Sequence, residues 1–285
     1  MTTTELTRAG EGPVSSGGLG QAFRDTMSIA WRNIRGGLRV PDTHIYMFIQ
    51  PIMFVLLFAY VFGGAIQVPG FESDPLAYRK ILMSGIFVQT MAFAVAPASV
   101  GLSDDMHKGL IDRFRSLPMA RSAVIGGRVV SDLANQFAVL IIMMLCGLIV
   151  GWRVEGSALG FFGAVGLLLL FAFAMLWVGA FIGLSVGNPQ VAASAGLIWL
   201  FPVIFLSNAF VPPQTMPAVV RTIAEWNPVS AIVAACRDLF GNPNPIASDA
   251  WPMQNPVLAA VLWCLLITAV FAPLAINKYK KAATK

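Results

Sequence analysis

The chain has 285 residues, of which 57% are hydrophobic and only 12% are charged. Soluble domains carry about 25% charged residues, so this composition excludes an ordinary soluble protein. The net charge of +5 follows from where the basic residues lie between the apolar runs, and it requires no nucleic-acid partner. Inside a membrane the backbone N–H and C=O groups of a long apolar run must bond to one another, as they do in a helix. The sequence therefore predicts an all-α membrane protein.

Five long segments contain no Asp, Glu, Lys or Arg, and each can hold a membrane span of about 20 residues. One of them, residues 156–220, is long enough for two spans. With both termini in the cytoplasm, 14 of the 19 Lys and Arg residues face the cytoplasm, which favours this orientation. The six predicted transmembrane helices cover about residues 44–66, 81–102, 128–151, 159–186, 192–210 and 255–277.

The N-terminal region precedes the first span and divides into two parts. Residues 1–18 are rich in Thr, Gly and Ser and are predicted to form a flexible cytoplasmic tail. Residues 19–42 are predicted to form an amphipathic helix that lies in the membrane interface, with a solvated linker helix as the alternative. Residues 43–285 then form the transmembrane domain. The interfacial helix is assigned Arg24, Trp31, Arg32 and Arg35.

Residues 103–121, between the second and third spans, form a dense block of charge on the cytoplasmic side. Ser103 is expected to cap a helix whose first turn carries Asp104 and Asp105, since acidic residues favour a helix N-terminus. Pro118 ends the predicted helix. Two interpretations follow from the residues alone: contact with a soluble partner, or an amphipathic loop that rests on the lipid headgroups.

Two further features lie at the membrane borders. Arg128 and Asp132 form an i,i+4 pair at the start of the third span, and we favour a structural ion pair over a proton relay. The predicted external segment 211–255 is rich in proline but contains two apolar pieces, Met216–Trp226 and Val229–Phe240. Because each piece is too short to span, we expect re-entrant or interfacial helices before the sixth span.

The sequence contains no motif for chemistry of its own. It has no phosphate-binding loop, no Gly-Lys pair and no G-x-S-x-G sequence, and its two histidines both lie near the predicted cytoplasmic border. Its three cysteines lack the spacing of a metal site. We therefore predict that the chain is not an enzyme and carries no catalytic residue, metal site or cofactor. Any transport would draw its energy from another polypeptide.

Three blocks of sequence carry a resemblance to a known family. The block Gln50–Gly64 resembles the first span of ABC-2 type exporter permeases of the daunorubicin-resistance (DrrB-like) group. Gly109–Pro118 resembles that group's cytoplasmic loop between spans two and three. Ser207–Pro212, followed by Met216–Pro217 and Asn227–Val229, resembles its outer segment after span five. The blocks occur in the family's order, and the resemblance covers nearly the whole chain after the tail.

The resemblance implies a larger machine in a bacterial plasma membrane. Two permeases, either copies or homologues, each dock on a separate ABC ATP-binding subunit, so that two copies of this subunit carry ATP and Mg. The charged loop would then be a coupling helix that sits in a cleft of the ATPase, and the N-terminal helix would contact the ATPase as well. The coupling residues implied in this way are Asp105, Lys108, Gly109, Leu110, Asp112, Arg113, Phe114, Arg115, Leu117 and Pro118.

The resemblance also implies export of a hydrophobic or amphipathic small molecule, such as a drug or antibiotic. The cavity is expected at the interface of the two permeases, lined by Gln50, Gln89, Thr90 and Asn208, although each of these could instead bond a neighbouring helix. Export of a lipid, lipid-linked glycan or peptide is the alternative within the family. A membrane anchor that recruits a soluble partner without transport is another, and a membrane transferase is the weakest because no acid–base or metal group is present.

Overall fold

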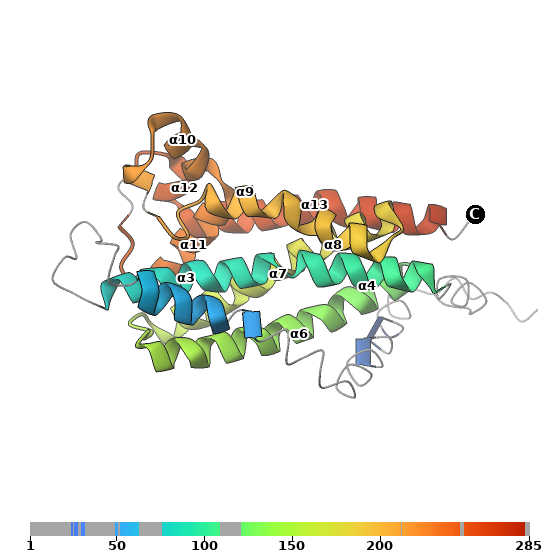
Figure 1. The fold of residues 1–285 in the computed structure, drawn as a ribbon, viewed down its shortest axis with the longest axis horizontal. Helices are drawn as coiled ribbons and strands as arrows, with labels where there is room; N and C mark the ends of the chain where they lie inside the picture. The colour runs from blue at the N-terminus through green and yellow to red at the C-terminus, as the bar shows by residue number, and fades with distance from the viewer. Residues whose placement is uncertain are drawn as a thin grey trace, which may run out of the picture.

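The computed structural model describes residues 24, 26–27, 30–31, 49–50, 52–62, 76–108, 121–211, 213–245 and 248–282. Within these ranges the chain is helical and contains no β-strand, which agrees with the predicted all-α class. The long helices lie side by side along the long axis of the molecule (Figure 1). In chain order the helices are η1 (Leu57–Phe62, a π-helix), α3 (Ala77–Ala92), α4 (Val95–His107), α6 (Arg121–Val150), α7 (Ala158–Val186), α8 (Pro189–Ile198), α9 (Leu200–Phe205), η2 (Pro213–Thr215), α10 (Ala218–Trp226), α11 (Pro228–Phe240), α12 (Trp251–Gln254) and α13 (Pro256–Ala282).

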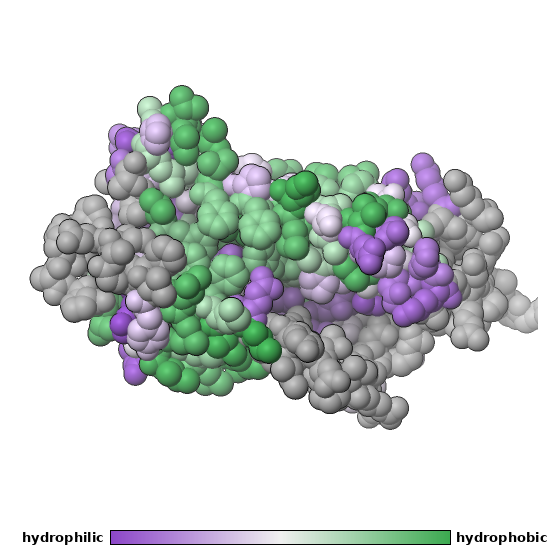
Figure 2. All heavy atoms as spheres, viewed as in Figure 1, coloured by the Kyte–Doolittle hydropathy of each residue, from purple (hydrophilic) through white to green (hydrophobic). Residues whose placement is uncertain are grey.

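Four helical segments are long and apolar enough to cross a membrane: Ala77–His107, Ile125–Val150, Ala158–Val186 and Pro256–Lys281. They correspond to the second, third, fourth and sixth predicted spans. In Figure 2 apolar side chains cover most of the middle of the molecule, and most hydrophilic side chains gather toward its two ends. The chain is therefore a multi-pass membrane protein by the length and composition of its helices.

The two ends of the bundle hold different elements. At one end α4 stops, α6 begins and α13 stops, and we call it the α4–α6 end (Figure 1). At the opposite end α3 begins and the short helices α10, α11 and α12 gather, and we call it the α10–α12 end (Figure 1). The long helices thus alternate in direction, as consecutive membrane spans must.

The second predicted span is interrupted between α3 and α4, which the sequence analysis did not anticipate. Pro97 has no N–H to donate to the carbonyl of Phe93 four residues earlier. The Phe93 carbonyl instead accepts from the Ala96 N–H at 3.1 Å, which tightens the chain at this point. The helix then resumes as α4.

The fifth predicted span is interrupted as well, so that it consists of α8 and α9. Pro202 lacks the N–H that the carbonyl of Ile198 would accept in a continuous helix, and α8 ends at Ile198. The two interruptions lie beside each other, because the ring centroids of Phe93 and Phe201 are 5.8 Å apart. The first predicted span is described only over residues 49–50 and 52–62.

The prediction that Ser103 caps a new helix was wrong. Helix α4 runs without a break from Val95 to His107, so Ser103 lies in its interior with a fully buried side chain. No proline follows Pro97 within α4, so the helix continues to His107. Asp104 and Asp105 therefore lie in its last turn and not in the first turn of a new helix. The third predicted span also begins earlier than expected, since α6 starts at Arg121.

Helices α10 and α11 coincide closely with the two short apolar pieces predicted before the sixth span. Asn227 separates them, and its Oδ1 accepts a hydrogen bond from the Val229 N–H at 2.8 Å, which caps α11. Gly241 ends α11 with a φ of +70°, a conformation that glycine adopts without the penalty of a Cβ. The re-entrant or interfacial placement of these helices stays a prediction.

Helix α7 lies at the centre of the bundle and buries most of its length against neighbours. A Cβ on Gly179 would lie 2.5 Å from the carbonyl oxygen of Val95, so the bare glycine allows α4 and α7 to approach closely. At the α10–α12 end, Trp152 packs edge-on against Phe87 and Phe240 and donates its indole N–H to Asn242 Oδ1 at 2.6 Å. The close approach of α7 sets the position of α4, which carries part of the candidate site.

Candidate functional site

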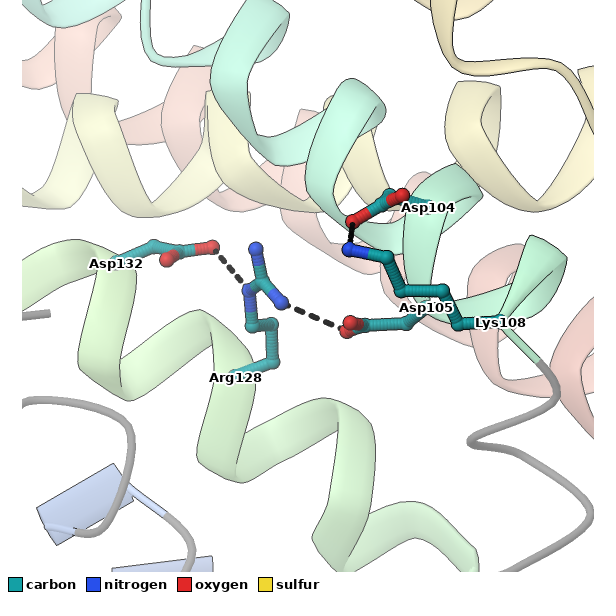
Figure 3. Close-up of polar contacts among 5 residues, drawn as sticks. All are labelled: Asp104, Asp105, Lys108, Arg128 and Asp132. Carbon is teal, nitrogen blue, oxygen red and sulfur yellow. Dashed lines mark hydrogen bonds and ion pairs between the residues drawn. The ribbon is translucent and has the colours of Figure 1, made fainter. Parts of the chain in front are cut away.

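An ion-pair cluster joins α4 to α6 at the α4–α6 end (Figure 3). Arg128 Nη1 lies 2.7 Å from Asp105 Oδ2 on α4, and Arg128 Nε lies 3.3 Å from Asp132 Oδ2 one turn further along α6. The three side chains are between 21% and 28% exposed, so water screens the attraction only in part. The predicted Arg128–Asp132 ion pair is confirmed, and Asp105 joins it as a third member that the sequence analysis had not paired.

A glycine on α4 makes room for this cluster. A Cβ on Gly101 would collide with Nη2 of Arg128, because the guanidinium lies directly against the α4 backbone. Asp105 follows Gly101 by one helical turn and therefore shares its face. The combination of a bare backbone and a carboxylate four residues later holds the guanidinium between the two helices.

A second ion pair lies on the outer side of the same turn. Lys108 Nζ is 2.6 Å from Asp104 Oδ2, and both side chains are exposed (Figure 3). The hydrogen bond from Lys108 to the Asp104 carboxylate raises the pKa of Lys108 above its usual value. This pair is open to solvent and contributes little to stability, whereas the half-buried Arg128 cluster fixes one helix against the other.

The cluster closes the base of the charged segment between α4 and α6. Asp105 precedes the end of α4 at His107, and Arg128 follows the start of α6 at Arg121. The charge-assisted bond therefore joins the two arms of the connection, from positions 23 residues apart in sequence. Of the predicted coupling residues, Asp105 and Lys108 are described, whereas Gly109, Leu110, Asp112, Arg113, Phe114, Arg115, Leu117 and Pro118 lie outside the described residues.

The predicted interfacial helix is described at only a few positions. Arg24 and Trp31 are helical and exposed, and Trp31 is 55% exposed. Arg32 and Arg35 lie outside the described residues. The contact of this helix with lipid or with a partner thus stays a prediction.

The four polar residues predicted to line a cavity lie in different surroundings. Gln50 is exposed, whereas Gln89 and Thr90 are buried in α3. The Thr90 hydroxyl donates to the carbonyl of Ile86 within its own helix at 2.8 Å. The side-chain amide nitrogen of Gln89 is buried and has no hydrogen-bond partner among the described residues.

Asn208, the fourth of these residues, belongs to a buried network at the α10–α12 end. Its N–H donates to Ser230 Oγ at 3.0 Å and its Nδ2 donates to the Ser230 carbonyl at 3.2 Å. Nearby, Asn227 Nδ2 donates to the carbonyls of Val203 and Leu206 at 2.7 and 2.9 Å. The two asparagines thereby bind the end of α9 to the start of α11.

Arg237 completes this network, and sequence reasoning missed it. The side chain is 2% exposed, and it donates to the carbonyls of Ile81, Asn208 and Ala209 at 3.2, 3.0 and 3.4 Å. Burial lowers the pKa of Arg237 to about 10, so the guanidinium keeps its charge at neutral pH. The sequence did offer one indication, because Arg237 stands inside the apolar piece 229–240. A guanidinium in such surroundings has five N–H donors that need acceptors, and backbone carbonyls can supply them.

Comparison with known proteins agrees with the family resemblance that the three blocks of sequence indicated. A family model described as ABC-2 type transporter matches residues 24–240. The chain is 30% identical over 274 residues to the daunorubicin resistance ABC transporter permease protein DrrB1 of Streptomyces coeruleorubidus, which covers 95% of this chain and 90% of the relative. It is 22% identical over 243 residues to the probable doxorubicin resistance ABC transporter permease protein DrrC of Mycobacterium tuberculosis, with 85% of this chain and 83% of the relative covered. The putative transport permease ycf38 of Porphyra purpurea is 25% identical over 206 residues, which cover 72% of this chain and 69% of the relative.

Proposed function

Because the chain belongs to the ABC-2 type transporter family, we propose that it is the membrane-spanning permease subunit of an ATP-driven exporter. Its cargo is a hydrophobic or amphipathic compound, such as a drug or antibiotic, that leaves the cell through the complex. The observation that carries the proposal is the 30% identity, over 95% of the chain, to a permease named for daunorubicin resistance. The apolar composition of the spans favours such a cargo over a small ion.

The proposed topology has six spans, with both termini in the cytoplasm of a bacterial cell. The four long helices, the interrupted helix of residues 189–205 and the first predicted span supply the six segments. The α4–α6 end then faces the cytoplasm, and Lys278, Lys280 and Lys281 near the end of α13 support this because positive charge favours the inner side. The α10–α12 end faces outward. Residues 1–18 form the tail, residues 19–42 the interfacial helix and residues 43–285 the ABC-2 type transmembrane domain.

The energy for export comes from separate ABC ATP-binding subunits in this proposal. Two copies of such a subunit hold ATP and Mg, and a second permease, either a copy or a homologue, completes the pathway. Support comes from the permease names of the relatives and from the lack of a phosphate-binding loop in the sequence.

The ion-pair cluster gives the charged segment a mechanical connection to the bundle. We place residues 109–118 in a cleft of the ATPase, where Leu110, Phe114 and Leu117 fill the cleft and the charges set the register. The Asp105–Arg128 bond ties both arms of the segment together at 2.7 Å. A displacement of the docked segment then moves α4 and α6 as one unit instead of spreading them apart.

Gln89 is the predicted cavity residue that the contacts support best. Its amide nitrogen is buried without a partner in the described part of the chain, and buried donors normally find one. Because the amide is inside the chain in this conformation, a second permease or the cargo would supply an acceptor only after α3 separates from its neighbours. The bonds of Asn208 to Ser230 favour the structural alternative for that residue, and Thr90 bonds within its own helix.

Transport by a reconstituted complex tests the proposal. The permease and an ABC ATP-binding subunit that co-purifies with it would be placed in proteoliposomes, and ATP hydrolysis and doxorubicin movement would be measured together. We expect doxorubicin to stimulate hydrolysis and to cross the membrane only with ATP. Stimulation by added lipid but not by doxorubicin would favour lipid export instead, and hydrolysis that no added compound alters would favour a membrane anchor.

A further inference from the structure

An apolar cavity of about 320 Å³ lies at the interruption between α8 and α9. Its walls come from α7, from Trp199 at the interruption, from α9, from the first residues of α11 and from α13. Every side chain that lines it is hydrophobic, and no polar atom is exposed on its wall. None of the predicted coupling or cavity residues takes part, so this site is separate from the ones described above.

The cavity has a buried floor and a half-buried rim. Phe171 and Met175 of α7 form part of the floor and are 1% and 3% exposed. Trp199 and Val203 on the interrupted helix and Ile267 on α13 are half-buried and form part of the rim. A ligand can therefore enter between α9 and α13 and reach side chains that the surrounding solvent or lipid does not touch.

The depth of the cavity places it among the hydrocarbon chains of a bilayer. Phe171 and Met175 lie near the middle of the candidate span Ala158–Val186, and Ile267 lies near the middle of the span Pro256–Lys281. Beside the rim on α13, Leu266 and Val270 are 53% and 45% exposed, as expected of residues that face lipid. The surface around the rim is thus apolar as well.

We infer that this cavity binds the hydrocarbon chain of a membrane lipid. A compound with amino or hydroxyl groups would lose their hydrogen bonds to water and find no replacement on this wall. An empty cavity forfeits dispersion contacts along its lining, and a chain that enters from the adjacent bilayer restores them without loss of any hydrogen bond. The volume is at the small end of ligand pockets, which start at about 300 Å³, so it accepts part of one chain rather than a whole lipid.

Photolabelling of the full chain in lipid nanodiscs tests this inference. The bilayer would be phosphatidylglycerol with a fraction of molecules that carry a diazirine near the end of one acyl chain. After irradiation, mass spectrometry locates the adducts. We expect adducts on the floor residues Phe171 and Met175, which lipid around the protein cannot reach, and on exposed Leu266, which it can. Adducts on Leu266 with none on the floor would overturn the inference.

Two matched substitutions on α13 sharpen the test. Ile267→Trp fills the cavity and should abolish the floor adducts, whereas Val270→Trp on the exposed face should leave them unchanged. Should Ile267→Trp lower the unfolding midpoint so far that it cannot be reconstituted, Val203→Phe fills the cavity from α9. Floor adducts that survive cavity filling would contradict the assignment.

A competition arm separates lipid from cargo. Excess doxorubicin should leave the floor adducts unchanged, since the wall offers nothing to its polar groups. Loss of the floor adducts in doxorubicin would show that the cavity holds cargo, and the lipid assignment would fall. No ATP-binding subunit takes part in these measurements, so their outcome does not depend on the proposed transport function.

Discussion

At the scale of single residues, Arg237 holds together three segments that are distant in sequence. Replacement by methionine keeps much of the volume but removes the donors to the carbonyls of Ile81, Asn208 and Ala209. We expect Arg237→Met to lower the free energy of unfolding by about 2–4 kcal/mol. Thermal unfolding of the purified chain in detergent measures this loss.

Arg221 offers a matched control for that substitution. It also donates to backbone carbonyls, those of Gln214 and Met216, but it is exposed. Arg221→Met should change the unfolding midpoint little because water replaces the lost bonds. Arg237→Lys should fall between the two, since one ammonium cannot match the fork of the guanidinium. An equal loss in Arg221→Met and Arg237→Met would show that burial is not the cause.

Arg128 is the second residue whose removal leaves charge without a partner. Arg128→Gln would leave the carboxylates of Asp105 and Asp132 partly buried with no cation between them. We expect a loss of about 1–3 kcal/mol in the free energy of unfolding. Lys108→Gln removes the exposed pair with Asp104 and should leave the unfolding midpoint unchanged, and a comparable drop in both variants would refute this distinction.

The sequence predicted the contacts of these charged residues only where the two partners are close in the chain. Arg128 and Asp132 are one helical turn apart, so helical periodicity alone predicted their contact. Asp105 lies on another helix, and Arg237 reaches a carbonyl 156 residues away. Those contacts depend on how helices pack, which a periodic pattern does not specify. Asn208 shows the same limit, since its polarity was evident but its bond to Ser230 was not.

At the scale of elements, two glycines of α7 predict opposite effects of the same substitution. A Cβ on Gly179 would lie 2.5 Å from the Val95 carbonyl oxygen and 2.8 Å from Ala98 Cβ, so α4 would have to move. Gly179→Ala should therefore lower the free energy of unfolding by about 1–3 kcal/mol. Gly166 has no neighbour within 4 Å of its Cβ position, and Gly166→Ala should raise stability by up to about 1 kcal/mol. If the unfolding midpoint shifts in the same direction in both variants, the result would contradict the packing of α4 on α7.

The elements themselves were largely predictable from charge and proline. Gaps between charges located α6, α7 and α13, because a span excludes ionised groups. Asn227 and Pro228 marked the boundary between α10 and α11. The interruptions after Ala92 and Ile198 were missed, since a proline within a long apolar run can end a helix, bend it or leave it continuous. Pro273 lies inside α13 without ending it, which shows why the sequence alone did not separate these outcomes.

At the scale of the whole molecule, the proposed coupling segment makes a prediction that involves the partner. Phe114→Ala should leave the unfolding midpoint of the permease unchanged but should reduce doxorubicin transport per ATP hydrolysed, because the side chain is proposed to fill the ATPase cleft. Leu159→Ala, an 84% exposed position at the α10–α12 end, is the control and should transport normally. Undiminished transport by Phe114→Ala would refute the docking assignment.

The neighbouring interruptions of the second and fifth predicted spans have a consequence for how the bundle yields to force. Each interruption removes a backbone hydrogen bond, and the contact between the Phe93 and Phe201 rings puts both at one level of the bundle. Helices α6 and α7 pass this level unbroken, so they are the stiff members beside two jointed ones. Because the Asp105–Arg128 bond ties α4 to α6, a load applied at the α4–α6 end will move these two helices together, and the chain will bend at the joint between α3 and α4.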